Sequence, residues 1–136
     1  MRGKLTITVV AALAAGLLLT AALASAGASA DGAPPAFMQQ VSAHSSNVTS
    51  VKLTPTSAVT AGNRIVVVVG VWSSGAATAK SVTDAAGNTY TEVLHFKASD
   101  NTEQSVWTAP ITAGGGTKPA ITVTSSAKAE IGRAHV

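Results

Sequence analysis

The sequence predicts an all-β fold, an antiparallel β-sandwich of immunoglobulin-like or jelly-roll type with about seven strands. Three observations support this prediction. Helical periodicity is absent after the first thirty residues, turn residues interrupt the chain roughly every 8–12 positions, and the β-branched residues Val and Thr are abundant. The chain has no cysteine, so the fold depends on a hydrophobic core rather than on disulfides. The remaining length suits one domain with one core.

Residues 1–30 have the three parts of a secretory signal peptide. Arg2 and Lys4 form a positive start, a long apolar stretch follows, and small residues end in an A-x-A site at Ala30. We expect cleavage after Ala30, which gives a secreted protein on the Sec route with a polar linker at 31–36. A retained membrane anchor is the alternative, and the small-residue run argues against it.

The charge balance excludes two classes of partner. The whole chain has nine Lys and Arg residues against six Asp and Glu residues. Three of the basic residues, Arg2, Lys4 and Arg133, lie outside residues 31–130, which leaves six basic against six acidic residues and a net charge of zero. No basic surface is left to attract nucleic acid or an anionic membrane, so we expect neither as a partner.

The expected strands are short stretches of alternating or continuous apolar residues between turns. They lie at residues 37–43, 51–53, 64–72, 78–83, 90–97, 104–109 and 120–124. The segment 64–72 is apolar at nearly every position, which predicts a central strand buried on both faces. Val82, Ile121 and Val123 are expected to point inward. Strict alternation along 90–97 places Glu92 and His95 on opposite faces.

The last six residues fit none of these patterns. Residues 131–136, I-G-R-A-H-V, are the translation of ATC GGA AGA GCA CAC GTC, a stretch of a common short-read sequencing adapter, and Glu130 fits the preceding AG. We therefore expect a domain at 37–130 that lacks its last strand or strands, with a non-native tail at 131–136. Further domains of the same chain would then be encoded downstream. A native C-terminus with this spelling is the alternative.

One stretch carries a family resemblance. Residues 81–90, S-V-T-D-A-A-G-N-T-Y, resemble the S-V-T-D-x-x-G-N-x-Y signature of secreted bacterial immunoglobulin-like or jelly-roll β-sandwich modules. Residues 53–55, 60–63 and 121–124 also fit that group, and the resemblance covers about residues 41–127. It implies a non-catalytic accessory, adhesive or spacer module.

The loop from Asp84 to Asn88 is the candidate metal site. Asp84 and Asn88, with Asp100 from another loop, would offer oxygen ligands to a calcium ion, which takes six to eight of them. The alternative is a tight turn in which Gly87 adopts a positive φ and the polar side chains bond to nearby backbone. No cofactor other than calcium is expected.

Trp107 and Tyr90 are the candidate ligand-binding residues, because exposed aromatic side chains stack on sugars in carbohydrate-binding sandwiches. Core packing is the alternative for both. Glu92 and Glu103 have the residue types of a glycosidase pair, but alternation places both on the surface. His44 and His95 lack a second type of ligand at metal-binding spacing.

No catalytic constellation is found, so the sequence predicts that this domain is not an enzyme. We expect a non-catalytic extracellular module that binds a surface glycan or another polymer, or that spaces other domains. The alternative is the N-terminal fragment of an exported polysaccharide-active enzyme whose catalytic domain lies beyond residue 136.

Overall fold

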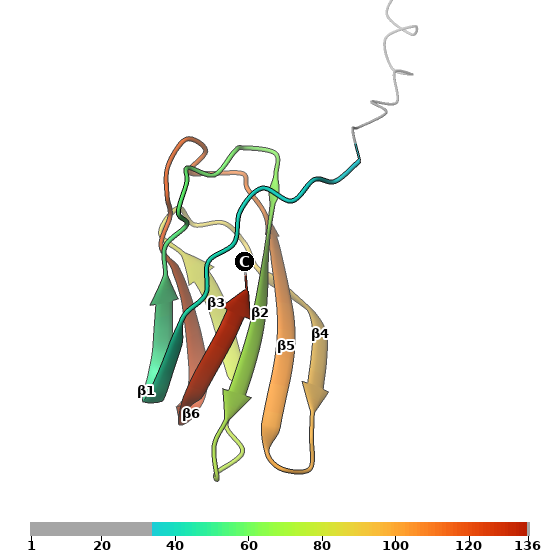
Figure 1. Cartoon of the computed structure of the whole chain (residues 1–136), viewed down its shortest axis with the longest axis vertical. Helices are drawn as coiled ribbons and strands as arrows, with labels where there is room; N and C mark the ends of the chain where they lie inside the picture. The colour runs from blue at the N-terminus through green and yellow to red at the C-terminus, as the bar shows by residue number, and fades with distance from the viewer. Residues whose placement is uncertain (1–33, 136) are drawn as a thin grey trace, which may run out of the picture. The chain divides into compact units, whose positions relative to one another are not determined.

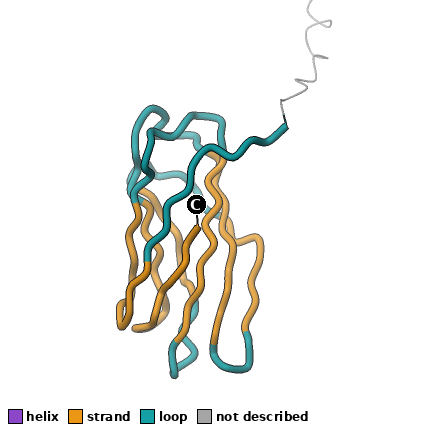
Figure 2. Tube along the Cα trace, viewed as in Figure 1, coloured by secondary structure: helices purple, strands orange, loops and turns teal. Residues whose placement is uncertain are grey.

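The computed structural model describes residues 34–135, with side chains up to residue 132. These residues form six β-strands and no helix (Figures 1 and 2). The strands are β1 (His44–Leu53), β2 (Arg64–Trp72), β3 (Ala79–Asp84), β4 (Thr91–Lys97), β5 (Thr102–Pro110) and β6 (Ile121–His135). All their pairings are antiparallel. The predicted all-β antiparallel fold is confirmed. The predicted leader at residues 1–30 lies outside the described residues.

Strand β6 has two sets of neighbours within one hydrogen-bonded sheet. The main path runs β1-β6-β2-β5-β4, and β3 pairs with β6 off this path (Figure 1). The first part of β6 pairs with β3, where Val123 lies opposite Val82. The last part pairs with β2, where Ile131 lies opposite Val71, and β1 pairs with both parts. One long strand thus joins two groups of strands, an arrangement consistent with a β-sandwich-like fold.

Strand β2 shows how the core is built. Its inward side chains are buried: Ile65, Val67, Val69 and Val71. Buried residues of β1, β3 and β6 pack with them, among them Leu53, Val82, Ile121 and Val123. The inward positions predicted for the last three are confirmed. The prediction that β2 is buried on both faces is wrong, because this antiparallel sheet packs against the core on one side only, and Val66 and Trp72 on the other side are exposed.

The segment at residues 37–43 was expected to be a strand, but β1 begins only at His44. The side chain of Gln39 bonds instead to the loop after β1. Its Oε1 accepts hydrogen bonds from the N–H of Ser57 (2.8 Å) and the hydroxyl of Thr56 (3.0 Å). Side-chain bonds of this kind hold the segment in place without a strand ladder. The described residues therefore contain six strands rather than about seven.

Strand β6 continues through the residues that were expected to form a tail. Ile131 is 1% exposed, and the ladder with β2 continues to His135. The strands approach closely at Gly70, where a Cβ atom would lie 3.0 Å from the carbonyl oxygen of Gly132. The expectation that residues 131–135 fit no strand is therefore wrong. The adapter origin of their codons stays a prediction, which sequencing of the source DNA across these codons tests.

Candidate functional site

The turn between β3 and β4 is held by the side chain of Asp84. Its Oδ1 accepts hydrogen bonds from the N–H groups of Ala86 (2.9 Å) and Asn88 (3.1 Å). Its Oδ2 accepts hydrogen bonds from Asn88 Nδ2 (2.8 Å) and the Tyr90 hydroxyl (3.0 Å). Gly87, with φ of 83°, takes the left-handed conformation that the turn requires. The polar residues of this loop therefore bond to one another and to local backbone.

The buried amide of Asn88 ties this turn to the segment after β5. Its Oδ1 accepts hydrogen bonds from the N–H groups of Thr112 (2.9 Å) and Ala113 (2.9 Å). Its Nδ2 donates to the carbonyl of Ala113 (3.2 Å) as well as to Asp84. Every polar atom of this side chain is thus used inside the protein, which indicates a structural role for Asn88.

The same contacts set the protonation of Asp84 and Tyr90. Partial burial acts to raise the pKa of Asp84, but the hydrogen bonds from Asn88, Tyr90 and Ala86 hold this pKa below its ordinary value. Burial, followed by the neighbouring Asp84 carboxylate, raises the pKa of Tyr90. Asp84 is therefore a carboxylate and Tyr90 a neutral phenol at neutral pH.

The structure does not bring Asp100 to the other two predicted calcium ligands. Asn88 bonds to residues just after the end of β5, whereas Asp100 lies just before its start, where it accepts a hydrogen bond from the N–H of Thr102 (3.0 Å). The nine residues of β5 span about 30 Å at the usual strand rise. Asp84 and Asn88 thus lie at one end of this strand and Asp100 at the other, so the three do not surround a single ion.

The two aromatic residues predicted to bind a ligand lie at the margin of the core. Trp107 and Tyr90 are half-buried and pack against the core cluster. The indole N–H of Trp107 donates to the hydroxyl of Ser105 (3.0 Å), and the Tyr90 hydroxyl donates to Asp84. The aromatic side chains that the described strands expose are Trp72 and Phe96.

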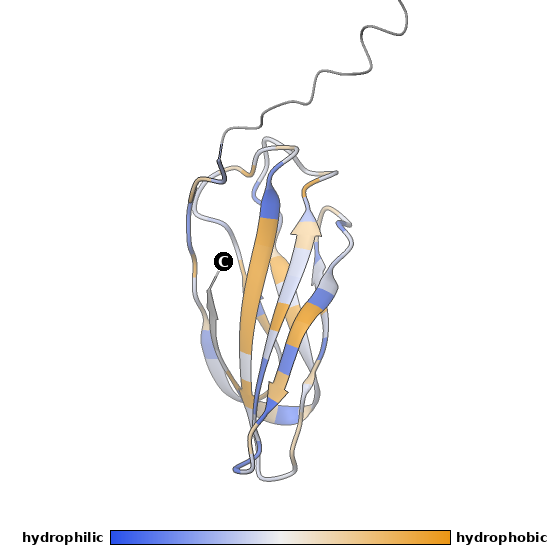
Figure 3. Cartoon of the chain, turned by 90° about the vertical axis from the view of Figure 1, so that its right-hand side faces the viewer, coloured by the Kyte–Doolittle hydropathy of each residue, from blue (hydrophilic) through white to orange (hydrophobic). Residues whose placement is uncertain are grey.

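Apolar residues gather on β2 and β4, on either side of β5 (Figure 3), and several of them are exposed. The strand register aligns Val68, Val106 and Leu94 in one row across the three strands. Four large apolar side chains here are 43–61% exposed, and we call them the outer patch: Val66, Trp72, Leu94 and Phe96. Polar side chains of β5 lie between them: Thr102, Gln104 and Thr108. Exposed apolar surface of this kind is typical of interaction sites.

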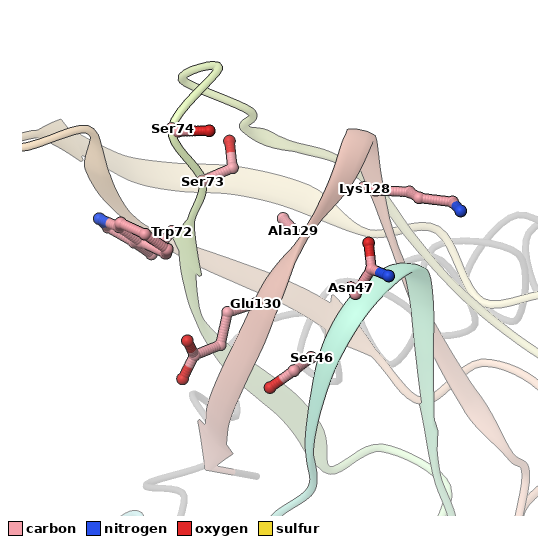
Figure 4. A pocket seen from close by; sticks show the side chains of 8 residues that line it. All are labelled: Ser46, Asn47, Trp72, Ser73, Ser74, Lys128, Ala129 and Glu130. Atoms are coloured by element: carbon pink, nitrogen blue, oxygen red, sulfur yellow. The ribbon is translucent and has the colours of Figure 1, made fainter.

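An open hollow of about 240 Å³ lies beside Trp72 (Figure 4). Residues of β1, β2 and β6 and of the loop after β2 line it, among them Lys128 and Glu130. The indole N–H of Trp72 donates to the carbonyl of Asp100 (3.2 Å), which fixes the ring at this place. Glu130 Oε1 lies 2.9 Å from Nε2 of His44. The hollow therefore extends the outer face toward a polar rim.

Three ionisable side chains converge at the β4–β5 hairpin, and we call Glu92, His95 and Glu103 the carboxylate–histidine triad. Nδ1 of His95 lies 3.1 Å from Glu92 Oε1 and 3.3 Å from Glu103 Oε1. The side chains of Glu92 and His95 are 35% and 44% exposed, whereas that of Glu103 is completely buried. One ligand atom from each residue lies within 4.8 Å of the other two.

Sequence reasoning missed this triad for two reasons. Strict alternation separates Glu92 from His95, but a register shift between Glu92 and Leu94 inserts a β-bulge that brings both to the same side. The expectation that Glu103 lies on the surface is wrong, because β3 covers it, and the N–H of Ala79 donates to Glu103 Oε2 (2.9 Å). The available signal was a Glu-x-x-His stretch followed, after a turn, by another Glu.

No helix within residues 34–135 is long and apolar enough to cross a membrane. No protein-family model, curated protein or solved structure matches the chain.

Proposed function

We propose that this chain is an exported, non-catalytic module that attaches to an uncharged surface glycan or related polymer through the outer patch. The leader-like residues 1–30 support export, and the resemblance at residues 81–90 supports an accessory module of immunoglobulin-like or jelly-roll type in a bacterial protein. The observation that carries the proposal is the exposed aromatic and apolar face of β2, β5 and β4.

The chemistry of this face suits a polysaccharide. Sugar rings present apolar C–H faces and hydroxyl edges, so they need both flat apolar surface and hydrogen-bonding groups. Trp72 and Phe96 lie two strands and two register positions apart, a separation of about 12 Å from ordinary strand spacings. Their rings provide surface for stacking, and Thr102 and Gln104 between them provide donors and acceptors. The balanced charge of residues 31–130 favours an uncharged polymer.

The acidic residues support binding without catalysis. A glycosidase needs two carboxyl groups that flank the bond to be cleaved. Glu103 is completely buried, so a sugar ring cannot reach its carboxylate. Asp84 is engaged by the hydrogen bonds of its own turn. If the chain is the N-terminal part of a polysaccharide-active enzyme, the outer patch would still act as its binding module.

The test is a pull-down on insoluble uncharged polysaccharides such as cellulose and chitin. The full coding sequence is expressed in a bacterial host, and the N-terminus of the purified chain is determined by mass spectrometry. We expect the chain to bind at least one uncharged polymer. Trp72→Ala and Phe96→Ala should each weaken this binding about tenfold, a loss of about 1.4 kcal/mol.

The matched control is Phe37→Ala, because Phe37 is an aromatic side chain that is 77% exposed but precedes the strands. It should bind like the wild-type chain. Equal losses in all three variants would contradict a role of the outer patch. A folded chain that binds none of the polymers would leave domain spacing as the function.

A further inference from the structure

Glu103 is completely buried, and one of its two carboxylate oxygens makes no hydrogen bond to the residues that the structure describes. Its Oε2 accepts the N–H of Ala79 (2.9 Å), but its Oε1 has no hydrogen-bond partner among the described residues. Buried carboxylates in proteins are paired, hydrogen-bonded or bound to metal ions, because burial of an uncompensated charge is strongly unfavourable. The orphan oxygen is directed toward His95 and therefore into the triad.

A hydrogen bond from His95 does not satisfy the unpaired Oε1 of Glu103. Nδ1 of His95 carries at most one proton, and Glu92 Oε1 is the closer acceptor at 3.1 Å. Lys97 lies directly opposite Glu103 in the ladder, but its side chain makes no ion pair within the described part of the chain. Nδ1 of His95 and two carboxylate oxygens thus face one another, and the single proton that Nδ1 can carry does not satisfy both carboxylates.

The spacing of these atoms suits a metal ion. Zinc binds His nitrogen and carboxylate oxygen at about 2.0–2.2 Å, which puts the ligand atoms of a tetrahedral site about 3.3–3.6 Å apart. The two measured separations from Nδ1, 3.1 and 3.3 Å, are close to this edge length. The third separation is also below 4.8 Å, so small side-chain rotations of the exposed Glu92 complete the geometry.

The donor set selects the class of ion. One imidazole nitrogen with two carboxylate oxygens suits a divalent transition metal such as zinc, whereas calcium and magnesium prefer oxygen ligands alone. The backbone N–H of Ala79 orients Glu103 through its other oxygen, as outer-shell hydrogen bonds orient metal ligands. Glu92 and His95 are partly exposed, which provides access for the ion and room for a water molecule as fourth ligand.

We propose that the carboxylate–histidine triad binds one divalent transition metal ion of the zinc class. The ion links β4, the last strand on the main path of the sheet, to its neighbour β5. It also neutralises the buried carboxylate of Glu103. This site is separate from the outer patch, because the triad lies on the opposite face of the same strands.

The experiment is a zinc titration of the full chain, expressed without a polyhistidine tag and stripped of metal with a chelator. We expect one equivalent of zinc to bind by calorimetry, and the melting temperature to rise with zinc but not with calcium. Glu103→Gln and His95→Asn should weaken zinc binding by more than about 100-fold, beyond the effect usual for outer-shell residues.

Two control variants distinguish loss of the triad site from unfolding of the chain and from zinc binding at another histidine. Metal-free Glu103→Gln should melt at or above the wild-type temperature, because a neutral amide replaces the buried carboxylate and its N–H can donate to Glu92. Its loss of zinc binding would then not reflect unfolding. His44→Asn removes the exposed pair of His44 with Glu130 and should leave zinc binding unchanged. The proposal is overturned if the folded wild-type chain binds no zinc, if Glu103→Gln keeps wild-type affinity, or if His44→Asn loses as much as His95→Asn.

Discussion

At the scale of single residues, Asp84 and Asn88 organise one end of the domain. The Asp84 carboxylate accepts four hydrogen bonds, and Asn88 carries the connection onward to Thr112 and Ala113. Because Asn88 is buried, its amide has no water to replace a lost partner. The D-x-x-G-N-x-Y part of the sequence signature is therefore explained by a network that holds a turn against a distant loop.

We expect Asp84→Asn to lower the free energy of unfolding by about 2–3 kcal/mol. The new amide presents N–H donors where Oδ2 accepts from Asn88 Nδ2, so this contact becomes donor against donor. The negative charge that strengthens the remaining hydrogen bonds of Asp84 is also lost. Urea denaturation measures the loss. Asp100→Asn is the control, because the exposed side chain of Asp100 bonds only within its own turn, and its effect should be clearly smaller. Equal losses would contradict the network.

The lowered pKa of Asp84 predicts an acid-dependent loss of stability. A carboxyl group whose pKa is lower in the folded than in the unfolded chain stabilises the fold at pH values above its unfolded pKa, about 3.8. This contribution is lost as the pH falls through the lower, folded pKa. Thermal melting between pH 5 and pH 2 should therefore show a smaller decline for Asp84→Asn than for the wild-type chain. A decline of the same size in both would refute the assignment to Asp84.

At the scale of elements, β6 holds the two groups of strands together. Its first residues pair with β3 and its last residues with β2, while β1 follows it along both parts. Ile131 contributes a side chain to the core from the last part. The stability of the whole sheet therefore depends on residues close to the end of the sequence.

We expect Ile131→Ala to lower the free energy of unfolding by about 2–5 kcal/mol, because it opens a cavity beside Val71. A chain that stops after Glu130 should be less stable still, since it also leaves part of β2 unpaired and prone to edge-to-edge association. Chemical denaturation and light scattering measure the two effects. Val66→Ala on the exposed face is the control and should change stability by no more than about 0.5 kcal/mol. Wild-type stability of the truncated chain would show that the β2–β6 pairing contributes little.

Strand β4 shows how one irregularity changes the chemistry of an element. All seven of its residues are exposed, so its sequence contributes little to the core. The bulge after Glu92 rotates the strand by one position and brings Glu92 to the side of His95. A regular strand would have left these two residues on opposite faces.

At the scale of the whole molecule, the exposed outer patch and the absence of net charge on residues 31–130 both favour self-association. The outer patch is exposed on a domain whose residues 31–130 have no net charge. Charge repulsion therefore does little to keep two copies of this face apart. Self-association at high concentration is the expected consequence when no polymer covers the face.

We expect Phe96→Lys to reduce this self-association without loss of stability. The substitution places a charge within the outer patch, and contact between two copies of this face would then have to remove that charge from water. Analytical ultracentrifugation should show a smaller sedimenting species, and the free energy of unfolding should change by less than about 0.5 kcal/mol. Phe37→Lys adds the same charge outside the strands and should leave sedimentation unchanged. If both variants act alike, net charge rather than the outer patch controls association.

Local sequence patterns were sufficient to predict several features of the fold. Turn residues and β-branched stretches located β2 to β5 closely, and they predicted the inward positions of Val82, Ile121 and Val123. The turn from Asp84 to Asn88 was also predictable, because Asp, Gly and Asn favour turns through their own side-chain and backbone geometry.

Tertiary packing determines which faces are covered and which distant residues meet. The apolar composition of β2 does not reveal that one face stays open, because burial depends on what packs against the strand. Asp84 and Asp100 lie at opposite ends of β5, so the length of this strand keeps them apart. The composition of the two loops does not encode that distance. Glu103 is buried because β3 covers it, and it meets Glu92 and His95 because a bulge breaks the two-residue period. These contacts join residues far apart in the chain, and a local pattern carries no information on them.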